Sequence, residues 1–294
     1  MAYELEFVNP YYEVKVDGEL ALVKNYKIVS VRDFPADTAE IEMDVLFLAE
    51  KGVKIEIWLG YREQQKWLVF QGVVNDISNT GETRKLFCRD HIIKLQNTKD
   101  KVTLMNVTPQ KVVKYALSKA GINKYELSKA NHQVRKQFPI NQKDDMVEII
   151  KKVNKAWGLD YPFYFQPDGT FYWGEKKVVE ADIPVFEYGV NIISMEMDEE
   201  NTSKRRLKTI SLPFLKHSML IKILHPEVDK EYFVINKVIH YTDSGFPRTE
   251  IYFEPEGYHK NLEPQKEKAA KGKKKNGRSK TSGKCTKKDH AKVL

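Results

Sequence analysis

The feature that most constrains this chain is a pattern that occurs twice. Residues 67–90 read WLVFQGVVNDISNTGETRKLFCRD, and residues 232–255 read YFVINKVIHYTDSGFPRTEIYFEP. In both stretches apolar residues alternate with polar ones, pause at a polar loop that contains glycine, and resume. A period of two places successive side chains on opposite faces of a strand. Each stretch therefore predicts two antiparallel strands joined by a short loop.

Both copies extend towards the N-terminus of these stretches. The first begins near Ile28 and the second near Ile193, and each contains five short alternating segments separated by turn residues. The expected equivalences, at offsets of 164 to 166, are Ser30 with Ser194, Ile57 with Ile223, Val69 with Val234, Val73 with Val238, and Thr83 with Thr249. Strands with one apolar face must close or stack to cover it, so each copy is predicted to be a small β-barrel or sandwich. Because any two antiparallel modules share such patterns, chance similarity stays open as an alternative.

Between the two copies the apolar period becomes helical. Thr108 and Pro109 are typical of a helix start, and Gly121 ends the apolar stripe that follows them. A second helix is expected to begin at residues 144–145 and to end at Gly158. An aromatic β-hairpin then follows over residues 161–173. These elements predict an inserted α+β domain with its own core.

The fold class is therefore α+β with four segments. They are a first β-barrel domain at 1–96, the inserted domain at 97–180, a second β-barrel domain at 181–260, and a Lys-rich tail at 261–294. The tail contains too few apolar residues to offset its ordering entropy, so it is predicted to be disordered when unbound.

The positive charge of the chain lies in its tail. The chain holds 49 Lys and Arg and 41 Asp and Glu, of which residues 261–294 hold 12 and three. The remaining 37 basic and 38 acidic residues make the body close to neutral. A general attraction of the body to phosphates is therefore not expected.

The two cysteines, Cys88 and Cys285, form no CxxC pair, which argues against a disulfide framework or a metal site. The N-terminal residues MAYELEFVNP do not resemble a signal peptide, and no apolar run approaches 18 residues. We therefore expect the chain to be made in the cytosol, with no membrane insertion.

The sequence offers little catalytic chemistry. The histidines are scattered without metal-ligand spacing, at His91, His132, His217, His225, His240, His259 and His290. The carboxylate pairs that could serve a glycosidase are Asp144 with Asp145, Glu196 with Asp198, and Glu199 with Glu200. A helix start and a solvated loop explain these pairs better, and no phosphate-binding loop or nucleophile elbow is present. The expectation is a protein that is not an enzyme, with no catalytic, cofactor-binding or metal residues and no small-molecule substrate.

The layout resembles a known family. A β-module ending in KIEIWLGYREQQKWLVFQGVV precedes a helical insert that contains LMNVTPQKVVKYALSKAGI and KDDMVEIIKKVNKAWGLDYPFYFQPDGTFYWGE. A second module closes with HSMLIKILHPEVDKEYFVINKVIHYTDSGFPRTEIYFEP. Over residues 1–258 the chain is similar to the baseplate hub proteins of phage tails, which include the late control protein D family and the hub portion of the type VI secretion spike protein. It lacks the glycine-rich needle and the lysozyme-like insert of some members.

The resemblance implies two tail-tube-like barrels and a structural function in a virion tail baseplate, or in a phage-tail-like particle, assembled in the host cytoplasm. It implies a homotrimer whose six similar modules join a hexameric tail tube to a threefold tip spike and nucleate tube assembly. The implied partners are the tube or distal tail protein, the tip spike protein and the tape-measure protein. Two other functions stay open: a tail-associated wall-degrading enzyme, and a nucleic-acid-binding protein that acts through its basic tail.

Overall fold

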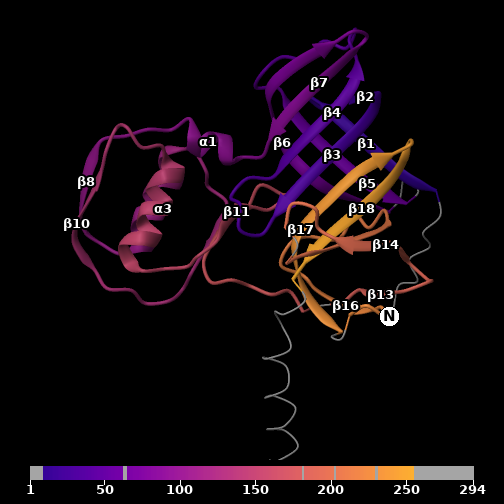
Figure 1. Cartoon of the computed structure of the whole chain (residues 1–294). Coiled ribbons are helices and arrows are strands. Elements are labelled where there is room, and N and C mark those ends of the chain that lie inside the picture. The colour runs from indigo at the N-terminus through magenta and orange to yellow at the C-terminus, as the bar shows by residue number, and fades with distance from the viewer. Residues whose placement is uncertain (1–8, 62–64, 181, 202, 229–230, 255–294) are drawn as a thin grey trace, which may run out of the picture. The chain divides into compact units, whose positions relative to one another are not determined.

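The computed structural model of the chain describes residues 9–61, 65–180, 182–201, 203–228 and 231–254, and Figure 1 shows its elements. Most of the secondary structure is antiparallel β-sheet, and the described residues contain three helices. The predicted Lys-rich tail, residues 261–294, lies outside the described residues.

The first group of strands precedes the helical insert. Its members are β1 (Pro10–Val16), β2 (Glu19–Ala21), β3 (Val23–Val31), β4 (Thr38–Asp44), β5 (Lys54–Tyr61), β6 (Gln65–Thr80) and β7 (Thr83–Arg89). They lie in the order β3-β4-β7-β6-β5-β1-β2, and every neighbouring pair is antiparallel. Ala39, Ile41 and Met43 are buried on alternate positions of β4, as the period of two predicts.

The second group follows the insert. Its members are β13 (Val185–Glu187), β14 (Ile192–Met197), β15 (Arg205–Ile210), β16 (Leu220–Leu224), β17 (Tyr232–Asp243) and β18 (Phe246–Phe253). The antiparallel strands lie in the order β14-β15-β18-β17-β16, and β13 adds to β16 in parallel. Strands β14 to β18 thus repeat the arrangement of β3 to β7 strand for strand. The predicted repeat is confirmed in its topology.

The two copies also share backbone hydrogen bonds. In each, the residues before the third strand of the copy exchange two bonds with the middle of the long fourth strand. In the first copy Gly52 N–H donates to the Val74 carbonyl (2.8 Å), and Val74 N–H donates to the Val53 carbonyl (2.9 Å). In the second copy Ser218 N–H donates to the Ile235 carbonyl (2.8 Å), and Ile235 N–H donates to the Met219 carbonyl (2.9 Å). A β-bulge follows at once in both copies, after Val74 and after Ile235.

These bonds align the copies residue by residue and correct part of the expected alignment. Lys54 pairs with Val73 across β5 and β6, and Leu220 pairs with Val234 across β16 and β17. Val73 therefore occupies the place of Val234, and Ile57 that of Ile223, as predicted. The predicted matches of Val69 with Val234 and of Val73 with Val238 are wrong by four residues, because the β5–β6 hairpin is longer than the β16–β17 hairpin.

The other two matches fail for related reasons. A bulge lies between Val23 and Asn25 in β3 and between Ile192 and Ser194 in β14, so Ser194 occupies the place of Asn25, not that of Ser30. Thr249 lies opposite Thr209 in β15, and the equivalent position opposite Met43 in β4 is Arg84, one residue beyond Thr83.

Pairing of β17 with β3 joins the two groups into one sheet of 13 strands. Residues 237–241 of β17 lie antiparallel to residues 27–31 of β3, and Figure 1 shows the orange β17 beside the indigo β3. Within the described residues, hydrogen bonding between strands does not close either group into a barrel of its own. Closure into two barrels stays a prediction.

The insert between the groups contains the helices. Its elements are α1 (Ile92–Gln96), β8 (Val102–Val107), α2 (Pro109–Lys119), β9 (Tyr125–Leu127), β10 (Arg135–Ile140), α3 (Met146–Trp157), β11 (Phe163–Phe165) and β12 (Phe171–Trp173). The Thr108 hydroxyl accepts a hydrogen bond from Lys111 N–H at the start of α2, and the Asp145 carboxylate accepts one from Glu148 N–H at the start of α3. Gly158 ends α3 in the left-handed conformation that favours glycine. Both predicted helices and the aromatic hairpin are confirmed.

In the part of the chain that the structure describes, buried apolar side chains form three clusters. One lies among β1 to β7 and includes Ile41 and Phe70, and a second lies among β13 to β18 and includes Phe233 and Phe253. The third belongs to the insert and contains Phe163 and Phe165 of β11 and Phe171 and Trp173 of β12, together with Ala36 from the loop after β3. These four aromatic side chains are core residues, whereas Tyr164 and Tyr172 lie outside the cluster.

Candidate assembly interface

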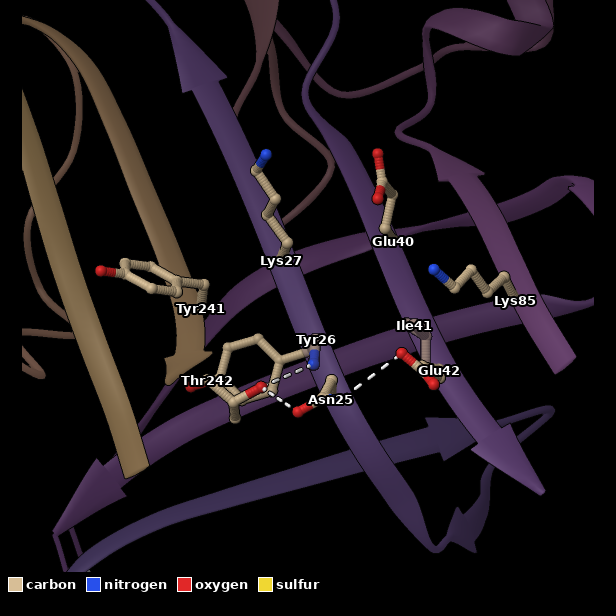
Figure 2. A pocket seen from close by; sticks show the side chains of 9 residues that line it. All are labelled: Asn25, Tyr26, Lys27, Glu40, Ile41, Glu42, Lys85, Tyr241 and Thr242. Carbon is tan, nitrogen blue, oxygen red and sulfur yellow. Dashed lines mark hydrogen bonds between the residues drawn. The ribbon is translucent and has the colours of Figure 1, made fainter. Parts of the chain in front are cut away.

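The junction between the two copies is a hydrogen-bonded strand pair with polar side chains on one face. Thr242 Oγ1 accepts a hydrogen bond from Tyr26 N–H at 3.1 Å and donates one to Asn25 Oδ1 at 3.1 Å. Asn25 in turn lies 3.4 Å from Glu42 of β4. These bonds, drawn as dashed lines in Figure 2, extend the β17–β3 ladder by side-chain contacts. The junction was not predicted, because strand periodicity does not say which strands pair.

A shallow hollow of about 170 Å³ lies over this junction. Figure 2 shows Lys27, Glu40, Lys85 and Tyr241 projecting from four neighbouring strands, β3, β4, β7 and β17. Pockets for organic ligands usually exceed about 300 Å³ and have mostly apolar walls. Size and lining therefore favour a mixed-charge surface over a small-molecule site.

Further contacts between the copies lie outside the ladder. The Tyr61 hydroxyl at the end of β5 donates a hydrogen bond to the carbonyl of Ser211, and the rings of Trp67 and Phe214 lie 6.3 Å apart between centroids. Burial raises the pKa of Tyr61 to about 12, which keeps its hydroxyl protonated and available as a donor. These contacts fix the segment after β15 against the first group of strands.

The insert meets the second group through an aromatic contact. The rings of Tyr164 and His217 pack edge to face with centroids 4.5 Å apart, and His217 Nδ1 lies 3.0 Å from the Ser218 hydroxyl. Burial lowers the pKa of His217 to about 4, so the ring is neutral at physiological pH. A neutral, buried imidazole in an aromatic contact acts here as a packing residue.

Two aspartates that the sequence did not single out meet beside this contact. Asp90 Oδ2 accepts a hydrogen bond from Asp37 N–H at 2.9 Å, and Asp90 Oδ1 accepts one from Ile92 N–H at 2.9 Å. Burial raises the pKa of both carboxyls, to about 7 for Asp37, and the nearby charge of Asp37 raises the pKa of Asp90 further. Asp90 thus ties the loop before β4 to the start of α1, with its oxygens occupied by backbone donors.

The carboxylates that sequence patterns single out are dispersed. Asp144 pairs with Lys152 at 2.5 Å, and Asp145 caps α3. Glu196 pairs with Arg206 at 2.6 Å, and Asp198 accepts a bond from Glu200 N–H within its own loop. Arg206 also lies 3.9 Å from Glu199, so these carboxylates have basic or backbone partners.

The histidines are equally separate. His91, His132, His217, His225 and His240 lie in different surroundings, and His259 and His290 fall outside the described residues. Across the described ranges no group of three or more His, Cys, Asp or Glu side chains is placed to hold a metal ion. Among the same residues, no helix is long and apolar enough to cross a membrane.

A larger open groove of about 770 Å³ lies beside β9 in the insert. Of its charged side chains, Lys177 pairs with Glu126 at 3.2 Å and Glu175 accepts a hydrogen bond from the Ser128 hydroxyl at 2.7 Å. Apart from Lys129, the charged side chains that line this groove are therefore engaged within the chain.

The sheet has open edges that carry apolar side chains. Among the described strands, β14 at one end of the sheet pairs only with β15, and its Ile193 and Met197 are 50% and 53% exposed. At the other end β2 pairs with β1 alone within the same residues, and Leu20 and the neighbouring Leu22 are exposed. Unpaired strand edges with exposed apolar residues are sites where another chain can add a strand.

Comparisons with known proteins place this geometry among tail proteins. No protein-family model and no curated protein matches the sequence. Among solved structures, the 43 kDa tail protein of prophage MuSo2 from Shewanella oneidensis is 12% identical, with a TM-score of 0.67 over 82% of this chain and 95% of that chain. A tail protein from Neisseria meningitidis MC58 is 13% identical, with a TM-score of 0.65 over 85% and 97%.

A third match comes from a secretion system. The c3393 protein of E. coli, a component of the type VI secretion system described as structurally similar to the T4 bacteriophage tail proteins gp27 and gp5, is 10% identical. Its TM-score is 0.60, over 84% of this chain and 77% of that chain. The chain therefore has the fold of phage tail proteins and of a type VI secretion component, and the resemblance drawn from the sequence is confirmed at the level of the fold.

Proposed function

We propose that this chain is the baseplate hub of a phage tail or a phage-tail-like particle, with a structural rather than an enzymatic role. The observation that carries the proposal is the repeated strand order, β3-β4-β7-β6-β5 and β14-β15-β18-β17-β16, within one polypeptide of tail-protein fold. A threefold hub has to present six similar surfaces to a sixfold tube. A module that occurs twice in each chain supplies them.

The duplicated module relates the symmetry of the proposed trimer to that of the tail tube. Three chains with two similar modules each present six similar modules to a hexameric tube, while the differences between the copies keep threefold order for a tip spike. Val73 and Val234 occupy equivalent places, but Gly72 occupies the place of Phe233. The two modules thus share a backbone arrangement and differ in side chains. The shared backbone would give the surface that faces the tube approximate sixfold symmetry, and the side-chain differences would leave the surface that faces the spike threefold.

The proposed partners follow from this position. They are a second and third copy of the chain, the tail tube or distal tail protein on one side, the tip spike protein on the other, and the tape-measure protein within the tube. On this proposal residues 1–96 and 181–260 are the tube-like domains and residues 97–180 the inserted domain, a division that the three apolar clusters support. The particle would be assembled in the host cytoplasm, with this chain in the virion tail.

Light scattering on the purified full chain tests the proposal. We expect a particle of about three times the chain mass of 34.3 kDa at micromolar concentration. Electron microscopy of the trimer mixed with the cognate tube protein should then show it at one end of each tube. A monomer at these concentrations, or binding along the sides of the tube, would contradict the hub function.

A further inference from the structure

We propose that β14 of one chain adds to the free edge of β6 in a second copy of the chain, in the register that β3 uses on β17. This inference rests on the proposed trimer and assigns its intersubunit surface. It treats the β17–β3 junction inside the chain as the template for the junction between chains.

The template is defined by five residue pairs. Residues 27–31 of β3 lie opposite residues 241–237 of β17, so that Lys27 faces Tyr241 and Val29 faces Ile239. Arg32 N–H donates to the Asn236 carbonyl at 2.8 Å, which places hydrogen-bonded pairs at 32 and 236, 30 and 238, and 28 and 240. Lys27 and Tyr241 therefore form a pair without mutual backbone bonds, the kind whose side chains lie closer together.

The equivalent half of β6 lacks a partner on the same edge. Val74 and Ile235 occupy equivalent places, fixed by the matching hydrogen bonds and bulges. Beyond Ile235, residues 237–241 have β18 on one edge and β3 on the other. Beyond Val74, residues 76–80 have β7 on one edge, whereas pairing with β5 on the other edge ends at Val73. No other described strand covers that edge.

The equivalent of β3 is β14, and no described strand pairs with its outer edge. The bulges at residues 24 and 193 align the two strands, and both pair on their inner edge with the next strand of their copy. Asp198 N–H donates to the Lys204 carbonyl at 2.9 Å, which continues the β14–β15 ladder beyond Met197. The equivalent pair in the first copy is Val29 with Thr38, at the same end of the β3–β4 ladder. The edge thus extends through Asp198.

Transfer of the template gives a specific register. Glu196 would face Thr80, Met197 would exchange hydrogen bonds with Asn79, and Asp198 would face Ser78 of the second copy. Ser78 itself lies opposite Lys85 of β7, and Asn79 lies opposite Arg84. The acidic side chains among residues 196–200 would thus approach Arg84 and Lys85 of β7, with the small polar side chains of β6 between them. Met197, which is 53% exposed in the single chain, would be covered by β6 of the second copy.

The proposed pairing could join three chains into a ring that uses one type of strand pair throughout. Each chain offers one β6 edge and one β14 edge, so the contact is head to tail and builds either a ring or an open filament. Alternation of the internal and the intersubunit junction would join all six modules of a trimer through the same strand pair. The continuity of this surface with the internal junction favours a second copy as the occupant over an unrelated peptide.

Disulfide cross-linking of the full chain tests the register. All variants carry Cys285→Ser, while buried Cys88 is kept. The pair Thr80→Cys with Glu196→Cys should give covalent dimers and then covalent trimers on oxidation. The matched control, Lys27→Cys with Tyr241→Cys, places the same pair within one chain and should lose its thiols with no change in mass. The pair Asn79→Cys with Glu196→Cys lies on opposite faces and should cross-link about tenfold less.

Each outcome decides a separate point. A trimer by light scattering that forms no cross-link, while the control pair oxidises, overturns the strand pairing and leaves the hub proposal standing. Covalent ladders beyond the trimer support the pairing but contradict the threefold ring. A monomer overturns both. Should the variants misfold, hydrogen exchange of the backbone amides in the unmodified chain tests the pairing. The amides of residues 77, 79 and 197 should exchange at least about tenfold more slowly than those on the open edge of β2. Equal exchange rates overturn the pairing.

Discussion

Thr249 Oγ1 lies 3.1 Å from His240 Nδ1, and the Leu215 carbonyl lies 3.3 Å from Nε2 of the same ring. The Leu215 carbonyl can only accept, so Nε2 of the neutral ring carries the proton and Nδ1 accepts from the Thr249 hydroxyl. The Thr249 hydroxyl itself accepts a hydrogen bond from Leu212 N–H at 2.9 Å. This chain of bonds holds a neutral imidazole at the place where β17 meets β3, opposite Ile28.

The first prediction concerns acid stability. Burial lowers the pKa of His240 to about 4, whereas the unfolded chain keeps a value near 6.5. The unfolded state binds more protons between these values, so the free energy of unfolding falls as pH drops from 6.5 to 4, by on the order of 3 kcal/mol from this residue. Urea unfolding of His240→Gln should show a smaller loss across that range. His225→Gln should parallel the unchanged protein, and parallel curves for His240→Gln would contradict the prediction.

The second prediction has the opposite sign. Burial raises the pKa of Asp37 to about 7, above the value of an unfolded aspartate. The folded state therefore binds more protons between pH 4 and 7, and its contribution to stability is lost as pH rises through 7. Urea unfolding should show that Asp37→Asn loses less stability than the unchanged chain as pH rises from 4 to 7. The exposed Asp33→Asn is the control, and an identical loss in both variants would contradict the assignment.

The third prediction concerns the difference between the copies. A Cβ at Gly72 would collide with the backbone carbonyl of Arg89 across the β6–β7 ladder, and backbone atoms cannot move aside as a flexible side chain can. Gly72→Ala should therefore cost at least about 3 kcal/mol in the free energy of unfolding, or abolish soluble expression. Ser78→Ala, on the exposed end of the same strand, should change stability by less than about 0.5 kcal/mol. A stable Gly72→Ala would show that the strands separate easily here.

The fourth prediction separates a structural from a catalytic role for the carboxylates of the insert. Asp145 accepts a hydrogen bond from Glu148 N–H at 2.9 Å, so Asp145→Ala should lower the free energy of unfolding by about 1 kcal/mol. Asp144→Ala removes an exposed pair with Lys152 and should cost less than about 1 kcal/mol. A zymogram on bacterial cell wall should show no clearing for any variant. Clearing that Asp145→Ala abolishes would support the wall-degrading alternative.

The fifth prediction concerns the basic tail. Removal of residues 262–294 takes away 12 Lys and Arg and leaves a nearly neutral chain, so retention on DNA at low salt should disappear. Trimer formation, measured by light scattering, should be unchanged. On the hub proposal the tail contacts a neighbouring tail component, so its removal should impair particle assembly. Intact assembly together with lost DNA retention would favour the nucleic-acid-binding alternative.

Local patterns predict the elements of this fold better than their partners. Thr108, Asp145 and Gly158 predict helix ends because capping depends on a few adjacent residues. The pairing of β17 with β3 depends on two edges more than 200 positions apart, and neither strand encodes its neighbour. The Asp37 and Asp90 pair was missed for the same reason: each aspartate alone is typical of a solvated loop, and only the tertiary fold brings them together.

The pairing of β3 with β17 also constrains how the chain can be made. Tyr26 and Thr242 are hydrogen-bonded across 216 positions, so the outer edge of β3 leaves the ribosome long before its partner is translated. At about 5 to 20 residues per second this interval lasts roughly 10 to 40 s. During synthesis each nascent chain thus carries an uncovered template strand, and neighbouring chains on one message could capture it before the chain's own second half arrives.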